Sequence, residues 1–271
     1  MKKSQKMNKP NISQKIPAYK RFFRCIIIFL FNTVFFPFRV KKSISFLNHI
    51  YEFDPLRPLH DKVKEVEIEE ILPGVYRQNI NLFDLESKYG SMTLQEIYTV
   101  AAIARNFNPK AIFEFGTFIG VTTLQMALNT DDDTKIYTLN LLSTGEDTKY
   151  DIGKTDEEKN LPDLQPGSRF KDSKVAGKIT QLYGDSAVFD FSQFENKIDF
   201  VLVDASHEYE YVKNDTEKTF GMLKQGGTIV WHDYPNSPGV FNYLNELAGE
   251  LTIYHIKDTH LAFSLNFNKE P

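Results

Sequence analysis

Strand-like and helix-like segments alternate along this chain from residue 91 to its carboxyl end. Short apolar runs predict buried strands at 111–116, 135–140, 178–184, 198–205 and 227–234. Apolar residues at helical spacing predict helices at 93–107, 121–129, 208–224 and 241–250. Two further strands, 251–257 and 260–267, close the chain, and we expect one of them to be antiparallel. The alternation predicts an α/β fold with a doubly wound, Rossmann-like, mostly parallel seven-stranded sheet.

Local signals refine three of these connections. Thr93 and Glu96 stand in capping-box positions at the start of the first helix. Gly226 and Gly227 predict a turn before the strand at 227–234. Residues 143–177 form a long polar connection rich in Gly, Pro and charge, which we interpret either as a lid over a site or as a solvated insertion.

Charge separates the first residues of the chain from the rest. Residues 1–42 hold 11 of the 32 Lys and Arg residues and none of the 36 acidic ones, which leaves 21 basic and 36 acidic residues in the remainder. Because residues 43–271 are strongly acidic, nucleic acid is an unfavourable partner for this part of the chain. The single cysteine, Cys25, excludes an internal disulfide bond, which suits a cytoplasmic location. We therefore expect an extension over residues 1–50 and a second domain over residues 51–271, and a homo-oligomer is compatible with both.

The extension carries an uncharged apolar run at residues 25–38, flanked by the basic stretches "KRFFR" at 20–24 and "RVKK" at 39–42. Residues 22–40 either touch a membrane or pack on the protein. The run is shorter than the roughly 20 apolar residues of a membrane-spanning helix, and no signal-peptide cleavage site follows it. Basic and aromatic side chains together suit the interface of an anionic membrane, such as the inner membrane face. Three interpretations stay open: interfacial binding, an apolar arm packed on protein, and a true span.

The segment "IFEFGTFIG" at residues 112–120 places a glycine turn directly after the first long strand. A dinucleotide site needs the spacing G-x-G-x-x-G and an acid at the end of the next strand. Here Phe118 stands in place of the middle glycine, and the next strand ends in Asn140. The turn is therefore a poor pyrophosphate site, although a small cofactor could approach its backbone closely.

Three stretches together give a specific resemblance: the glycine turn, "YGDSAVFDF" at 183–191, and the segment from "VDASHEYEY" to "WHDY" at 203–234. They resemble class I S-adenosylmethionine-dependent methyltransferases, in particular a bacterial subfamily related to catechol-type and antibiotic or sugar O-methyltransferases. The resemblance covers residues 88–266 and leaves out residues 1–50 and the insertion 143–177. It implies methyl transfer to the hydroxyl group of a small molecule or glycan.

The resemblance also implies a cofactor site at named positions. Gly116 and Gly120 would form the turn under the methionine part of the cofactor, with Glu114 beside its amino-acid end. Asn140 occupies the place of the acid that usually binds the ribose, and can still hydrogen-bond a hydroxyl. Asp185 and Ser186 would lie near the adenine, and Asp204 would also lie near the cofactor.

Catalytic roles are implied at the ends of the fourth and fifth strands. His207 stands where catechol-type relatives carry the base that takes the proton of the acceptor hydroxyl. Asp204 and Asp233 match the positions of metal ligands and would hold Mg²⁺. The third ligand position holds Tyr234, a poor magnesium ligand, so two alternatives stay open: a metal-free site with Asp204 near the cofactor, and structural roles for both acids. His232 adjoins the site, but neighbours on a strand point to opposite faces, which would turn it away.

Aromatic side chains near these strand ends suggest an acceptor pocket. Trp231, His232, Tyr234 and Tyr209 could line it, although strand and helix aromatics more often belong to the core. Two other functions stay open: a non-catalytic binding module tethered to a membrane, and an NAD-dependent oxidoreductase, which the glycine spacing disfavours.

Overall fold

The computed structural model describes residues 62–85, 91–141, 148–152 and 165–267, together with Ile27, Leu30 and Phe31. Two compact units divide the chain, Met1–Arg57 and Pro58–Pro271. The predicted boundary after residue 50, most of the apolar segment 22–40 and part of the predicted insertion lie outside the described residues. Among those that are described, no helix has the length and apolar character needed to cross a bilayer.

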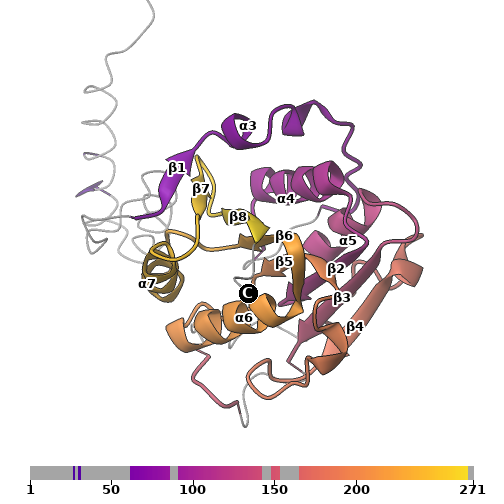
Figure 1. The fold of residues 1–271 in the computed structure, drawn as a ribbon. Coiled ribbons are helices and arrows are strands. Elements are labelled where there is room, and N and C mark those ends of the chain that lie inside the picture. Colours follow the sequence, from indigo (N-terminus) through magenta and orange to yellow (C-terminus); the bar gives the residue numbers. More distant parts are fainter. Residues whose placement is uncertain are drawn as a thin grey trace, which may run out of the picture. The chain divides into compact units, whose positions relative to one another are not determined.

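The second unit alternates helices and strands as predicted (Figure 1). Its strands are β1 (Lys64–Val66), β2 (Ala111–Phe115), β3 (Lys135–Asn140), β4 (Ile179–Tyr183), β5 (Ile198–Val203), β6 (Leu223–Trp231), β7 (Tyr254–Ile256) and β8 (Ala262–Phe267). Its α-helices are α3 (Ile68–Ile71), α4 (Leu94–Phe107), α5 (Val121–Leu128), α6 (Tyr209–Met222) and α7 (Pro238–Leu247). Short 3-10 turns lie at Val75–Arg77, Ala176–Lys178 and Ser192–Phe194.

The strands form one sheet in the order β1-β7-β8-β6-β5-β2-β3-β4. Only β8 runs antiparallel to its neighbours, which confirms the doubly wound, mostly parallel fold with one antiparallel strand. The sheet has eight strands rather than seven, because β1 adds to the edge beside β7. This strand is only three residues long and is largely exposed, so it left no hydrophobic pattern in the sequence.

Two apolar layers cover the two faces of the sheet. One layer packs α6 and α7 against Phe113, Phe115 and their neighbours, and the other packs α4 and α5 against Ile112 and its neighbours. Because successive strand residues point to opposite faces, Glu114 shares the face of Ile112 and lies on the α4 and α5 side. The central strands β2 and β5 are buried on both faces, which explains their near-continuous apolar sequences.

Two boundaries bear on the site. The capping box of α4 is confirmed: Thr93 Oγ1 accepts from the Glu96 amide, and Glu96 Oε2 accepts from the Thr93 amide at 2.7 Å. The glycine pair lies within β6 rather than before it, because β6 starts at Leu223 directly after α6. Gly226 has φ +79°, and the register shifts at the glycines, so they form an irregularity inside the strand. β6 ends at Trp231, three residues earlier than predicted.

Candidate active site

The carboxyl ends of the central strands meet at one edge of the sheet. The pairing register aligns the ends of β2, β5 and β6, so that the residues directly after them, Gly116, Asp204 and His232, lie side by side. β3 ends beside them in Asn140, and Asp185 follows two residues after the end of β4. The structure therefore brings the predicted site residues to the edge where open α/β sheets bind ligands.

The glycine turn lies directly against the end of β5. Gly116 has φ +88°, and a Cβ atom there would stand 1.9 Å from the backbone oxygen of Asp204. Gly120 has φ +85°, and its Cβ would stand 2.6 Å from the ring of Phe170. Only glycine meets both demands at Gly116: a left-handed backbone and contact with a neighbouring main chain.

The last part of the predicted insertion packs on this turn. The amide of Gly167 donates to Phe118 O at 2.9 Å, and the amide of Arg169 donates to Ile119 O at 3.0 Å. Arg169 also forms a salt bridge with Asp84 at 2.9 Å. Gly167 and Arg169 of the insertion therefore brace the turn. Of the segment 143–177, which we interpreted as a possible lid, residues 143–147 and 153–164 lie outside the described part.

Asn140 holds the glycine turn from the neighbouring strand. Its Oδ1 accepts from the amides of Thr117 and Phe118, each at 3.2 Å, and its Nδ2 donates to Leu141 O at 2.8 Å. The amide side chain thus fixes the turn where the resemblance implied an acid for the ribose. One N–H of Nδ2 is left for a ligand after this bond, as an amide carries two donors.

Glu114 lies beneath the turn and is 1% exposed. Its Oε2 accepts from the hydroxyls of Thr123 and Thr138, each at 2.5 Å. Burial raises the pKa of Glu114 to about 8, although the two hydroxyls favour the charged form. The structure therefore encloses this acid between β2, α5 and β3, and its predicted contact with the cofactor stays a prediction.

Asp185 is bound by three donors from its surroundings. Its Oδ1 accepts from the Ala187 amide and from the Tyr211 hydroxyl, both at 2.9 Å, and its Oδ2 accepts from the Lys149 amide at 2.8 Å. Ser186 is 9% exposed, and burial raises the pKa of the buried Asp215 near it to about 7. Both predicted adenine contacts lie at the sheet edge, and the side chain of Asp185 organises the loop around it.

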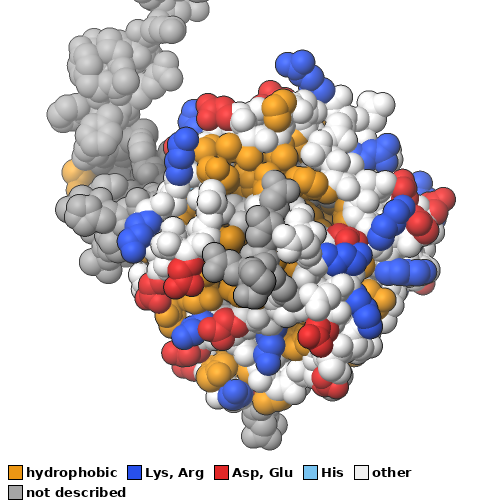
Figure 2. Space-filling model, viewed as in Figure 1, with side chains coloured by type: hydrophobic (Ala, Val, Ile, Leu, Met, Phe, Trp, Pro, Cys, Tyr) orange, Lys and Arg blue, Asp and Glu red, His pale blue; other side chains and the backbone are white. Residues whose placement is uncertain are grey.

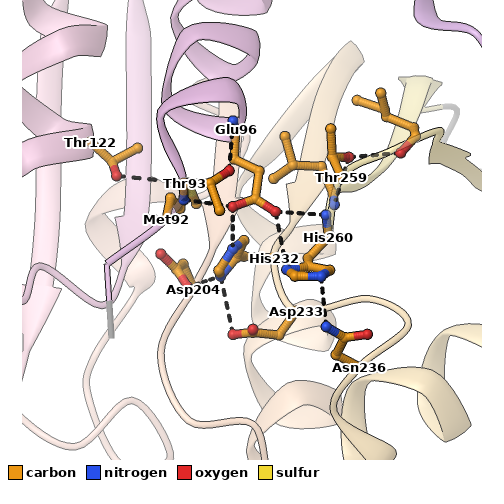
Figure 3. Close-up of polar contacts among 12 residues, drawn as sticks. Met92, Thr93, Glu96, Thr122, Asp204, His232, Asp233, Asn236, Thr259 and His260 are labelled. Atoms are coloured by element: carbon orange, nitrogen blue, oxygen red, sulfur yellow. Dashed lines mark hydrogen bonds and ion pairs between the residues drawn. The ribbon is translucent and has the colours of Figure 1, made fainter. Parts of the chain in front are cut away.

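Acids and histidines converge at the ends of β5 and β6 (Figure 3). His232 Nδ1 lies 3.0 Å from Asp204 Oδ1 and 3.1 Å from Asp233 Oδ2. His207 Nε2 lies 2.7 Å from the same Asp233 oxygen. The expectation that His232 turns away is wrong, because β6 has ended and Asp233 adopts φ +60°, which brings both side chains to one side.

Charge pairing sets the protonation of this cluster. Burial disfavours the charge of His207, but its bond to Asp233 outweighs this and raises the pKa of His207 to about 9. Burial also opposes the charge of Asp233, yet His232 and His207 hold the pKa of this acid well below its usual range. Asp204 and Asp233 raise the pKa of His232 well above its ordinary value, against the effect of burial. The free protein thus carries a charged His207–Asp233 pair at neutral pH.

Residues 113–234 match the family model described as "Methyltransferase domain". This part of the chain is similar to a methyltransferase domain. The match includes Gly116, Gly120, Asp204, His207 and Asp233. No curated protein matches the chain.

Two solved structures are similar to this chain. Cofactor-bound Rv0187 from MTB is 14% identical with a TM-score of 0.50, and the match covers 83% of this chain and 96% of that one. TomG, an O-methyltransferase from Streptomyces achromogenes in complex with SAM, is 16% identical with a TM-score of 0.48, over 76% of this chain and 92% of that one. At such identities, the likeness to Rv0187 shows the fold alone.

The expected aromatic pocket of the methyltransferase domain needs correction. Tyr234 is fully buried, stacks on Phe241 with 5.6 Å between ring centroids, and accepts from Asn245 Nδ2 at 3.2 Å. Tyr209 donates to Glu246 at 2.6 Å. Tyr234 is therefore a core residue. Trp231 and His232 do line a small cavity, together with Val203, Asp204, Ala205, Ser206, His207, Val212 and Val240.

Two residues of the cluster escaped the sequence reasoning: Glu96 and His260. Glu96 Oε1 accepts from the His260 amide at 2.7 Å and lies 3.2 Å from His260 Nδ1, while Glu96 Oε2 lies 3.5 Å from His232 Nε2. Glu96 did leave a signal, its capping-box position, but that signal concerns α4 only. No local pattern connects it with His260, 164 residues away.

Proposed function

We propose that this protein is an S-adenosylmethionine-dependent O-methyltransferase that acts on the hydroxyl group of a small molecule or sugar. The observation that carries the proposal is the His207–Asp233 pair, at 2.7 Å, on the same sheet edge as the glycine turn. A histidine oriented by a carboxylate is the usual base for removing a hydroxyl proton. The methyltransferase domain match supplies the reaction class.

The turn fits a small cofactor better than a dinucleotide. Asn140 already accepts from the amides of Thr117 and Phe118, which a pyrophosphate would need. Gly116 and Gly120 would form the turn under the methionine part of the cofactor. Glu114 would lie beneath this turn, near the amino-acid end of the cofactor, and Asp204 would lie near the cofactor. Asn140, Asp185 and Ser186 would border the adenosine part. When bound, S-adenosylmethionine supplies an electrophilic methyl group on a sulfonium centre.

His207 is the residue proposed to move the proton. Its Nε2 is engaged with Asp233, so Nδ1 is the nitrogen that accepts the proton of the acceptor hydroxyl. Asp233 holds the ring in place and stabilises the imidazolium that forms. A pKa of about 9 means that His207 must lose a proton before it can act as the base, so the rate of methyl transfer rises with pH toward 9.

The binding of Mg²⁺ by Asp204 and Asp233 stays a prediction. The two carboxylates converge, but on His232 Nδ1, at 3.0 and 3.1 Å. The hydroxyl of Tyr234, at the third ligand position, is buried and directed to Asn245. We therefore derive no step of methyl transfer through Mg²⁺.

The intact pair of base and orienting acid also weighs against a non-catalytic module, since a binding protein needs neither. The NAD-dependent alternative is opposed by Phe118 and by the two turn amides that Asn140 occupies.

Methyl transfer from labelled S-adenosylmethionine to extracts of the producing cell, with and without Mg²⁺, tests the proposal. We expect a labelled product with the wild-type protein and a strongly reduced one with Asp233→Asn. Asp132→Asn, in an exposed turn, is the matched control and should retain activity. An unchanged rate of methyl transfer by Asp233→Asn would contradict the assignment of His207 and Asp233 as the base and its orienting acid.

We further propose that residues 1–50 attach the domain 51–271 to an anionic membrane surface on the cytoplasmic side. Residues 1–42 carry 11 basic and no acidic residues. Ile27, Leu30 and Phe31 are helical, are spaced to share one face, and are 62%, 55% and 55% exposed. Flotation with anionic liposomes should recover the full chain but not a chain that lacks residues 1–42, and equal recovery of both would refute the attachment.

A further inference from the structure

Glu96, His232 and His260 form a second cluster (Figure 3). Glu96 and His260 lie on the opposite side of the His232 ring from Asp204 and Asp233. They come from the first turn of α4, from the residue after β6 and from the β7–β8 connection. Glu96 is 1% exposed and His232 is 8% exposed. One donor atom from each of the three lies within 4.8 Å of the others.

His232 Nε2 is the unusual atom of this group. It is buried and makes no hydrogen bond within the part of the chain that the structure describes. The carboxylate nearest to it, Glu96 Oε2, is 3.5 Å away, and Glu96 Oε1 is 3.2 Å from His260 Nδ1. Donors around a tetrahedral Zn²⁺, with bonds of about 2.0–2.1 Å, stand roughly 3.3 Å apart. Each histidine nitrogen thus stands near this spacing from one oxygen of Glu96, and one donor atom from each of the three residues lies within 4.8 Å of the others, so the three converge on one place for a cation.

The second nitrogen of each histidine is also engaged. His232 Nδ1 faces Asp204 and Asp233 at 3.0 and 3.1 Å, and His260 Nε2 lies 2.6 Å from Asn236 Nδ2. Histidines that bind metals nearly always donate their other N–H to a carboxylate or a carbonyl group, which orients the ring. His232 fits this rule as it stands, whereas His260 meets it with the Asn236 amide turned to present its oxygen.

Glu96 is held just as firmly. Its two oxygens accept from the amides of Thr93 and His260, both at 2.7 Å. A carboxylate oxygen has two lone pairs, so each oxygen can still bind a cation. The carboxylate is thus fixed by the backbone of two separate elements before any ligand arrives.

We propose that Glu96, His232 and His260 bind one first-row transition-metal cation of the Zn²⁺ type, with water in the remaining position. Two imidazole nitrogens and one carboxylate oxygen suit such a cation and do not suit Mg²⁺, which prefers oxygen ligands. The cation takes the place of a proton on His232 Nε2, so that binding releases a proton. The cation would hold the His232 ring with its Nδ1–H directed toward Asp204 and Asp233. This bond would fix the position of Asp233, which orients His207.

The test uses the untagged full-length protein, freed of metal by a chelator and then titrated with Zn²⁺, Co²⁺ and Mg²⁺. We expect one Zn²⁺ per chain, competition by Co²⁺ with the visible absorption of a tetrahedral site, and no competition by Mg²⁺. His260→Ala should weaken Zn²⁺ binding at least about 100-fold, because it removes a ligand. Asp204→Asn should weaken it only about 10- to 100-fold, as an outer partner does.

Two variants keep the test decisive. Glu96→Gln keeps the capping box of α4 and should still lose the metal. His207→Ala touches Asp233 but no proposed ligand, and should bind Zn²⁺ within about threefold of wild type. Circular dichroism checks that each variant is folded.

Failure of the chelator-treated protein to take up Zn²⁺ would overturn the proposal. Zn²⁺ uptake equal to that of wild type in folded Glu96→Gln and folded His260→Ala would also overturn it. Loss of uptake in Asp233→Asn together with full uptake in His260→Ala would overturn it as well, because that result would place the cation on the aspartates.

Discussion

Replacing Glu114 with glutamine should remove a pH-dependent loss of stability. Glu114 is buried beneath the glycine turn, and its pKa rises from 4.5 to about 8 on folding. Below pH 4.5 the carboxyl is protonated in both the folded and the unfolded chain, so it has no effect. Between the two pKa values, the folded state binds the proton that the unfolded state has lost. Stability therefore falls as pH rises through this window.

The magnitude follows from the size of the shift. Each pH unit inside the window costs about 1.4 kcal/mol, so the free energy of unfolding should fall by about 4 kcal/mol between pH 5 and pH 8 from this residue alone. Glutamine carries no titratable proton, and its oxygen can accept from both Thr123 and Thr138 as the carboxyl does. The difference between wild type and Glu114→Gln should therefore change with pH by that amount.

Urea unfolding of both proteins at several pH values measures this difference. Asp215→Asn is the matched control, because Asp215 is a second buried acid whose pKa burial raises to about 7. Its own contribution should end near pH 7. His207, whose pKa rises to about 9, contributes equally to wild type and Glu114→Gln, so the difference between these two proteins from pH 7 to pH 8 isolates Glu114. Parallel stability curves for wild type and Glu114→Gln would refute the assignment of a protonated Glu114.

Three further predictions concern the site and the turn. His207→Ala should lower methyl transfer by about 100- to 10,000-fold while cofactor affinity stays within about threefold, and the wild-type rate should rise toward pH 9; a flat pH profile would count against His207 as the base. Gly116→Ala should cost about 1–3 kcal/mol more in thermal unfolding than Gly74→Ala, since both glycines are left-handed but only the first Cβ meets Asp204; equal costs would contradict this packing. Thr93→Ala should cost about 1 kcal/mol of stability through the lost cap of α4, and no measurable loss would show that the cap is dispensable.

Local chemistry made part of the fold predictable. The capping box at Thr93 and Glu96 and the apolar runs of β2 to β5 are short-range signals, and the structure confirms them. β1 could not be predicted, because its three residues pair with β7, about 190 residues later in the chain. Its stability depends on that partner rather than on its own sequence.

The site was predictable to the level of strand ends and no further. Asp204 and Asp233 were placed together because parallel strands end at the same edge. The direction of His232 depends on where β6 ends and on the left-handed backbone of Asp233, which no strand pattern reveals. The link between Glu96 and His260 arises only when α4 packs beside the β7–β8 connection.

Calorimetric titration of the full chain with S-adenosylmethionine and, separately, with NAD tests the proposed function most directly. We expect one molecule of S-adenosylmethionine to bind per chain and NAD to give no heat of binding, because Asn140 occupies the turn amides that a pyrophosphate would need. Binding of NAD, or no binding of S-adenosylmethionine, would contradict the assignment of this turn to the methyl donor.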